Sequence, residues 1–347
     1  MTKLSVLDLV RIKQGGDART ALDDTRDLAA HLERWGYGRI WISEHHNAAG
    51  IASAATALVL AHIGAATSTI RLAAGGIMLP NHAPYVIAEQ FGTLARLFPG
   101  RVDLGLGRAP GTGPAAIQAL RRPPQSVDEF PQDVRELQAY FAPAVPGQRL
   151  VAAPADGTEV PLTILGSSLF GAALAGEFGL PFAFASHFSP DLLLDALRLY
   201  RERFKPSNQL DRPYALVGVN VVAAETDAEA RRLATSQQKS FADLFQYGAS
   251  GPLEPPVDDI DAYWSAPAKA QAGRMLARSV VGGPATVEEG LEALVEETGA
   301  DELVLVSDIY SHAARLRSFE IVASVMGLTT PAGTRAADPV EALAPSL

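Results

Sequence analysis

The side chains best suited to chemistry lie in two short segments. Glu44, His45 and His46 are consecutive, and His82 follows a Leu-Pro-Asn motif later in the chain. An unperturbed imidazole titrates near pH 6.5, so it can exchange protons under physiological conditions, and it is also a common metal ligand. The two segments therefore suit either general acid–base catalysis or a metal site.

A metal site is the weaker of these interpretations. The chain has no cysteine and no His-x-His pair. Successive residues of a strand point to opposite faces, so His45 and His46 could not both face one site while in strand geometry. A metal would need His45, His82 and a carboxylate such as Glu44 or Asp103. We expect no metal, and a metallohydrolase is the alternative class.

Two other segments suit an anion. Gly166, Ser167 and Ser168 precede an expected helix that begins at Leu169, and free amides and hydroxyls at a helix N-terminus bind phosphate. Arg108 ends the preceding expected strand and could add a guanidinium to the same anion. The structural alternative is a capping serine and a surface arginine. Taken together, these residues are as compatible with a phosphate-bearing ligand as with a structural role.

The elements that must position these residues alternate along the chain. Apolar, β-rich runs occupy residues 4–9, 39–43, 70–79, 101–108, 162–166, 181–186, 216–223 and 302–307. Helical patterns between them include residues 17–35, 53–67, 84–98 and 169–178, and proline or glycine marks several of their ends. This alternation predicts parallel βαβ units, and eight strands close a (β/α)8 TIM barrel. A doubly wound sheet is disfavoured because no G-x-G-x-x-G motif follows the first strand.

In such a barrel, functional side chains follow the C-terminal ends of strands, as the segments above do. Gly75-Gly76 inside the third strand also needs an explanation, because glycine weakens a strand. Either a flat ring lies against this backbone or the strand bulges there.

Two segments are longer than the minimal βα repeat. Residues 109–160 hold one helical pattern, at 128–141, and residues 248–269 are rich in proline and aspartate. Insertions in βα loops shape the mouth of a barrel, so both are candidate lids, and surface loops without a role are the alternative. Residues 1–328 are expected to form one barrel domain. Residues 329–347, rich in Ala and Pro, are expected to be a flexible tail.

Composition narrows the functional classes. The net charge is −10 and no basic run is present, which argues against nucleic-acid binding. No stretch reaches the roughly 18 apolar residues of a membrane span. The N-terminus lacks the long apolar region of a signal peptide. With no cysteine, the chain is expected to be a soluble cytoplasmic protein.

Several motifs, taken together, resemble those of the bacterial-luciferase-like flavin monooxygenases. They are Glu-His-His at the second strand, Leu-Pro-Asn-His-Ala-Pro after the third, Gly-Arg-Val-Asp-Leu-Gly-Leu-Gly-Arg-Ala at the fourth and Ile-Leu-Gly-Ser-Ser at the fifth. The resemblance spans roughly residues 4–326. Within the family, the sequence looks most similar to the single-component members whose substrate is unassigned.

The resemblance implies a cofactor and the residues that bind it. The cofactor is reduced FMN, held without a covalent bond, or the deazaflavin F420 in one branch of the family. Arg108, Ser167 and Ser168 match the residues that bind the flavin phosphate. Gly75-Gly76 matches a non-prolyl cis peptide behind the flavin ring.

The resemblance also implies the reaction. A separate flavin reductase supplies reduced FMN, and dioxygen forms a C4a-peroxyflavin that oxidises a small organic substrate. His45 matches the catalytic histidine near the flavin, and Glu44 precedes it. Family members commonly form homodimers through their early helices. The alternatives are F420-dependent hydride transfer and a non-catalytic flavin-binding protein.

This sequence departs from the luciferase pattern at two points. Gly166 stands where the luciferase has a glutamate, and the luciferase's long closing loop has no clear counterpart beyond residues 248–269. Neither light emission nor an aldehyde substrate is implied.

Overall fold

Eight parallel strands close into a barrel in the computed structural model, which describes residues 2–109, 111–121, 124–248 and 251–329. The strands are β1 (Lys3–Asp8), β2 (Arg39–Ile42), β3 (Arg71–Met78), β4 (Val102–Gly107), β5 (Leu162–Gly166), β6 (Phe182–Phe184), β7 (Ala215–Ala223) and β9 (Glu302–Val306). β1 to β7 pair in chain order, and β9 closes the ring between β7 and β1. The predicted (β/α)8 fold is confirmed, with strand ends within two residues of those expected.

A ninth strand lies outside the ring. β8 (Val280–Gly282) pairs with the last residues of β7, from Val221 to Ala223. The sequence patterns did not predict it. Three residues are too few to show a strand period, so only the position beside β7 identifies this segment as a strand.

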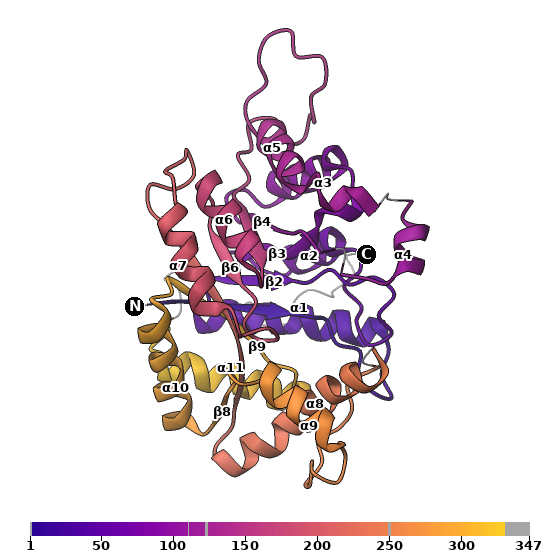
Figure 1. Cartoon of the computed structure of the whole chain (residues 1–347), viewed down its shortest axis with the longest axis vertical. Coiled ribbons are helices and arrows are strands. Elements are labelled where there is room, and N and C mark those ends of the chain that lie inside the picture. The colour runs from indigo at the N-terminus through magenta and orange to yellow at the C-terminus, as the bar shows by residue number, and fades with distance from the viewer. Residues whose placement is uncertain (1, 110, 122–123, 249–250, 330–347) are drawn as a thin grey trace, which may run out of the picture.

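Helices surround the barrel, as Figure 1 shows. They are α1 (Ala18–Trp35), α2 (Thr56–Gly64), α3 (Pro84–Leu97), α6 (Leu169–Phe178), α7 (Leu193–Arg203), α8 (Asp227–Tyr247), α10 (Pro284–Thr298) and α11 (His312–Val325). Local signals set several ends: the Asp17 carboxylate accepts a hydrogen bond from the Thr20 amide, and Gly36 ends α1 in the left-handed conformation. The helix expected at 53–67 is shorter, because Ser53 bonds to Ser43 and belongs to the preceding loop.

The two long segments lie between β4 and β5 and between β7 and β8. Residues 109–160 contain α4 (Pro114–Ala119), a 3-10 turn η2 (Pro124–Val127) and α5 (Phe130–Phe141), and the chain after α5 projects from the body (Figure 1). Residues 251–264 lead to α9 (Ala266–Met275), and Leu253 exchanges backbone hydrogen bonds of 2.8 Å with Ile12 and Gln14. The predicted tail, apart from Thr329, lies outside the described residues. None of the described helices is both long and apolar enough to span a bilayer.

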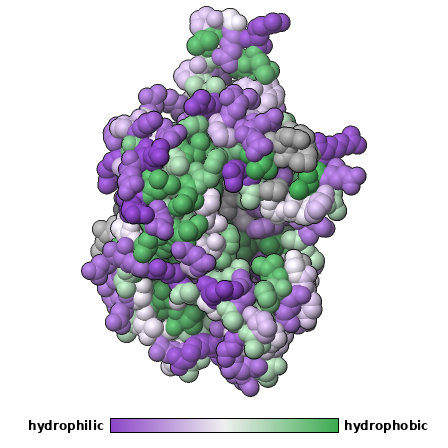
Figure 2. Space-filling view, in the orientation of Figure 1, coloured by the Kyte–Doolittle hydropathy of each residue, from purple (hydrophilic) through white to green (hydrophobic). Residues whose placement is uncertain are grey.

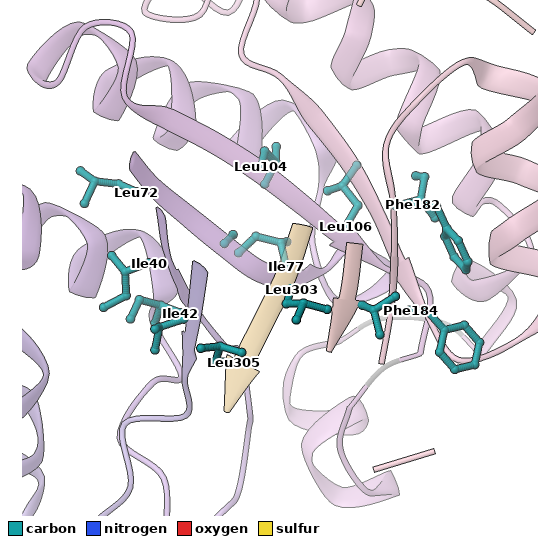
Figure 3. Packing of buried hydrophobic residues seen from close by; sticks show 14 of the residues in the cluster. Ile40, Ile42, Leu72, Ile77, Leu104, Leu106, Phe182, Phe184, Leu303 and Leu305 are labelled. Carbon is teal, nitrogen blue, oxygen red and sulfur yellow. The ribbon is translucent and has the colours of Figure 1, made fainter. Parts of the chain in front are cut away.

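Two apolar layers fill the molecule. The outer layer lies between strands and helices, and Figure 3 shows its strand residues, among them Ile40, Leu72 and Leu303. The inner layer, within the ring, consists of Leu7, Trp41, Ala73, Ala183, Leu216, Val304 and Val306. At the N-terminal end of the ring, ion pairs replace apolar contacts: Asp103 lies 2.9 Å from Arg39 and 2.6 Å from Arg71.

Trp41 leaves no room for side chains on the neighbouring strands. It is 1% exposed, and its indole N–H donates to the Ser5 hydroxyl at 3.0 Å. A Cβ on Gly75 would lie 2.8 Å from the Trp41 Cβ, and a Cβ on Gly105 would lie 3.1 Å from Trp41 Cζ3 and overlap the Ala74 carbonyl oxygen. The strand register shifts between Ala74 and Ile77. The Gly75–Gly76 peptide bond is cis, as predicted.

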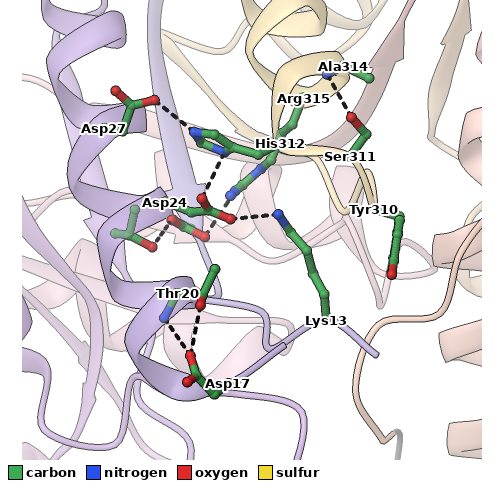
Figure 4. A network of polar contacts seen from close by, with 12 residues as sticks. Lys13, Asp17, Thr20, Asp24, Asp27, Tyr310, Ser311, His312, Ala314 and Arg315 are labelled. Carbon is green, nitrogen blue, oxygen red and sulfur yellow. Dashed lines mark hydrogen bonds and ion pairs between the residues drawn. The ribbon is translucent and has the colours of Figure 1, made fainter. Parts of the chain in front are cut away.

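A polar network connects the end of β1 with α1 and α11 (Figure 4). Asp8 is fully buried and accepts hydrogen bonds from Thr25 at 2.7 Å and from Arg315 at 3.0 Å. Burial alone would raise the pKa of Asp8, but Arg315 and the hydrogen bonds outweigh it and lower the pKa. The first and last helices are thereby tied to the C-terminal end of the barrel.

The glycine contacts predict the effect of one methyl group. Gly105→Ala is expected to lower the free energy of unfolding by about 3 kcal/mol, because packed strands cannot move away from the added carbon. Urea unfolding followed by circular dichroism measures this. Gly166→Ala is the matched control, since a Cβ there meets no atom within 4 Å. It should change stability by less than about 0.5 kcal/mol. Equal effects of both substitutions would contradict the packing around Trp41.

Candidate functional site

The sequence-predicted site residues lie at one end of the barrel. Parallel strands place all their C-terminal ends together, and Glu44, His45, Arg108 and Ser167 each follow a strand within three residues. His82 follows η1 (Leu79–Asn81), the short turn after β3. In Figure 2 a hollow opens to the right of the centre, between the α4 region and the α8–α9 region.

Glu44 joins two histidines from different loops. Its Oε1 lies 2.8 Å from His46 Nε2 and 2.8 Å from His82 Nε2, and its side chain is 1% exposed. His45, its immediate neighbour, makes no such bond with it. Glu44 therefore holds the loop after β2 against the segment after β3.

The cluster of Glu44, His46 and His82 also has the composition of a metal site. The ligand atoms of Glu44, His46 and His82 lie within 4.8 Å of one another, which is close enough for one ion. The combination considered from the sequence, with His45 and Asp103, does not come together, because Asp103 lies at the start of β4 among arginines. At 2.8 Å the contacts are those of two N–H donors to one carboxylate, so we interpret the cluster as hydrogen-bonded.

His45 lies in a loop and not on a strand. β2 ends at Ile42, so strand alternation does not control the directions of His45 and His46, contrary to expectation. His45 is half-buried, and its backbone N–H lies 3.4 Å from the Ser53 carbonyl oxygen. Burial and, after it, the Arg11 charge lower its pKa, whereas Glu44 opposes them. The imidazole is therefore neutral at pH 7 and able to accept a proton.

Arg108 and the start of α6 form a second group. The Arg108 guanidinium lies over the Phe170 ring, 4.0 Å from its centroid, and Phe170 is the second residue of α6. Ser168 is the N-cap of that helix, but its side chain makes no capping bond. Among the described residues, neither Arg108 nor the hydroxyls of Ser167 and Ser168 have a hydrogen-bond or ion-pair partner. A guanidinium, two hydroxyls and a helix N-terminus are thus available to one anion.

Sequence reasoning missed two basic side chains near this end. Arg11 follows β1, is 8% exposed, and contacts Ser240 at 2.9 Å and Asp308 at 3.6 Å. His187 follows β6, and burial together with the positive form of His45 lowers its pKa to about 4. Both residues directly follow predicted strands, so the strand-end rule applied to every strand would have identified them.

Comparison with known proteins gives consistent matches. The model of a family described as luciferase-like monooxygenase matches residues 2–302. A protein of Escherichia coli (strain K12) named luciferase-like monooxygenase is 48% identical, over 92% of this chain and 96% of its own. YvbT of Bacillus subtilis (strain 168) is 51% identical, over 93% and 96%. An N-acetyl-S-alkylcysteine monooxygenase of the same bacterium is 34% identical, over 69% and 72%.

Solved structures resemble the fold over nearly its whole length. Apo-MsnO8 has a TM-score of 0.84 and 33% identity, and covers 95% of this chain and 99% of its own. A type II Baeyer-Villiger monooxygenase encoded on the CAM plasmid of Pseudomonas putida, in complex with FMN, has a TM-score of 0.69 at 20% identity, over 93% and 96%. An F420-dependent secondary alcohol dehydrogenase has a TM-score of 0.65 at 15% identity, over 93% and 98%. At these sequence identities, the last two proteins show only that they share the fold of this chain.

Proposed function

The chain belongs to the luciferase-like monooxygenase family, and we propose that it uses reduced FMN and dioxygen to oxidise a small organic substrate. The observation that carries this proposal is the unpartnered group formed by Arg108, Ser167 and Ser168 at the start of α6. A half-buried guanidinium and two hydroxyls that make no hydrogen bond within the protein, beside a helix N-terminus, favour an anionic ligand.

The residues present fit FMN. A terminal phosphate offers several acceptor oxygens, which the Arg108 guanidinium and the two serine hydroxyls can bind. β3 pairs with β4, which leads to Arg108, so Gly75-Gly76 lies on the strand next to the proposed phosphate site. Glycines without side chains allow a flat ring to approach this backbone. When bound, reduced FMN supplies the electrons and the reactive carbon with which dioxygen is activated.

The chain's own share of the chemistry is positioning and proton transfer. His45, neutral at pH 7, accepts a proton at an imidazole nitrogen and returns it later in the cycle. Glu44 acts through His46 and His82, which it holds, and is a positioning residue in this proposal.

Reducing equivalents would come from another protein. A G-x-G-x-x-G fingerprint for a nicotinamide cofactor does not follow the first strand, so we propose a separate flavin reductase as the source of reduced FMN. Both proteins would act in the cytoplasm. This reducing compartment suits a chain that has no cysteine and therefore no disulfide bonds.

The reaction type is testable without knowing the natural substrate. The relative and the FMN complex named above act on a thioether and a ketone by name, so a suitable panel is N-acetyl-S-propylcysteine, cyclohexanone, decanal and ethanesulfonate. The enzyme is supplied with FMN, NADH and a generic flavin reductase under ¹⁸O₂. One labelled oxygen in a product supports the monooxygenase. Product without label, obtained with F420, supports hydride transfer, and hydrogen peroxide alone supports passive flavin binding.

Arg108→Ala is expected to weaken FMN binding by about 1.5–3 kcal/mol, the usual size of a charge-assisted hydrogen bond. Isothermal titration measures the change. Arg135→Ala is the matched control, because Arg135 lies over Phe178 at the other end of the same helix, 4.9 Å from its centroid. Its FMN affinity should not change. Unchanged affinity in Arg108→Ala would reject the phosphate site.

Separate substitutions of His45 and His46 distinguish a catalytic role from a structural one. His45→Ala should bind FMN normally and lose about 10²- to 10⁴-fold in turnover, the usual share of acid–base catalysis. His46→Ala removes a bond to Glu44 and should chiefly lower stability. Because the His45 pKa lies below 6.5, turnover should be constant between pH 8 and 6.5 and fall at more acidic pH as the imidazole gains a proton. Small, equal effects of both substitutions would assign His45 a structural role.

We also propose that the chain forms a homodimer through α2 and α3. Leu58 is 73% exposed, Leu97 61% and Val86 44%, and all three lie on these neighbouring helices. The double substitution Leu58→Glu and Leu97→Glu should shift the mass in light scattering from twice 36.6 kDa to 36.6 kDa. Leu194→Glu on α7, also exposed, should leave the mass unchanged. A monomeric unmodified protein at micromolar concentration would contradict the dimer.

A further inference from the structure

His187 lies at the same end of the barrel as His45, and its strand β6 pairs with β5, the strand that leads to Ser167. It follows β6 by three residues, in the loop that leads towards α7, and is half-buried. Its ring contacts the Phe188 ring edge-on, with centroids 4.9 Å apart. It is near enough to His45 for the charge of one to affect the other.

The β7 backbone is shaped around this imidazole. A Cβ on Gly218 would overlap His187 Nδ1 and lie 3.3 Å from Cε1, so only glycine leaves space for the ring at that position. Nδ1 is buried there and has no hydrogen-bond partner among the described residues. Because His187 as a whole is half-buried and Nδ1 is its enclosed nitrogen, Nε2 is the ring nitrogen that faces the accessible side.

Buried polar groups hold the His187 backbone in place. The Asn220 side-chain amide donates to the His187 carbonyl oxygen, and Gln237 donates to Asn220 Oδ1 at 2.8 Å. Asn220 and Gln237 are 2% and 3% exposed. The Ser186 hydroxyl donates to the Gly218 carbonyl oxygen, which ties the loop to the strand that accommodates the ring. A satisfied buried network of this kind fixes the position of the residue that it surrounds.

The position of the proton on His187 follows from these contacts. Burial and the nearby His45 lower its pKa to about 4, so the imidazole is neutral at pH 7 and carries one N–H. Nδ1 has no partner in either tautomer, but an orphaned buried N–H is rarer in native proteins than an unpaired acceptor, whereas a proton on Nε2 faces the accessible side, where a ligand or water can accept it. The proton is therefore on Nε2, which makes His187 a hydrogen-bond donor, whereas His45 is a proton acceptor.

We propose that His187 is a substrate-binding residue that donates a hydrogen bond from Nε2 to an acceptor oxygen of the substrate, at the β6–β7 side of the barrel mouth. This inference rests on the proposed function and adds a substrate class to it: small compounds with a carbonyl, carboxylate or sulfonate oxygen. A site built to donate to an oxygen discriminates strongly against analogues that lack it.

Two variants distinguish a donor at Nε2 from a packing role. The amide of glutamine can occupy the position of Nε2, whereas that of asparagine reaches only the position of Nδ1. His187→Gln should keep kcat/KM for an oxygen-bearing compound of the panel within about 3-fold, whereas His187→Asn and His187→Ala should lower it roughly 10-fold, mainly through KM. FMN affinity should be unchanged in all three.

Gly218→Ala provides an independent variant, because the added methyl displaces the ring without removing it. It should lower kcat/KM about as much as His187→Ala, and the double variant should be no worse than either alone. Additive losses, or equal losses in His187→Gln and His187→Ala, would overturn the proposal.

Nuclear magnetic resonance of the full chain labelled with ¹⁵N-histidine provides a readout that needs no substrate. At pH 7 the His187 signals, assigned by their loss in His187→Gln, should be those of a neutral ring protonated at Nε2. A charged ring or a proton on Nδ1 would overturn the proposal even if FMN binds as expected. Failure of the proposed function would be recognised by a different result, namely unchanged FMN affinity in Arg108→Ala.

Discussion

The packing of one indole ring inside a narrow barrel is the constraint on which the structure around the site depends. Trp41 belongs to the apolar layer inside the ring, and Gly75 and Gly105 cannot take a Cβ. At Gly75 the added carbon would lie 2.8 Å from the Trp41 Cβ, and at Gly105 it would overlap the Ala74 carbonyl oxygen and the Leu165 side chain. Those glycines let β3 and β4 approach closely, and the register shift between Ala74 and Ile77 lies at the same point. Arg108, one residue beyond β4, lies over Phe170 in the first turn of α6.

The polar groups at the barrel mouth divide into satisfied and unsatisfied sets. Glu44, His46 and His82 satisfy one another and hold two loops together. The Arg108 guanidinium and the Ser167 and Ser168 hydroxyls lack such partners among the described residues. Because an unpaired polar group near the interior costs free energy, the second set is where a ligand compensates most. The residues that hold the two loops together are therefore different from the residues whose polar groups have no hydrogen-bond partner.

The surroundings of His45 and His187 at the barrel mouth keep these two imidazoles neutral at pH 7. Burial lowers the pKa of both His45 and His187, and the buried Arg11 adds to the effect on His45. Two neutral imidazoles can then differ in role, since one accepts a proton and the other donates a hydrogen bond. Asp308, which lies 3.6 Å from Arg11, limits how strongly that cation acts on its surroundings.

The sequence by itself determined the elements and the end of the barrel at which the candidate site residues lie together. Apolar periodicity, proline and glycine are local signals, so all eight ring strands could be predicted from them. The cis bond at Gly75-Gly76 was predicted from the resemblance to a known family, because the two glycines alone fit a bulge equally well. Parallel strands then place every strand-end residue on one side. The tertiary structure alone decided which of these residues meet. His46 and not His45 bonds to Glu44, and His187 depends on a glycine of β7, because loop paths and space between distant segments are not encoded in any local pattern.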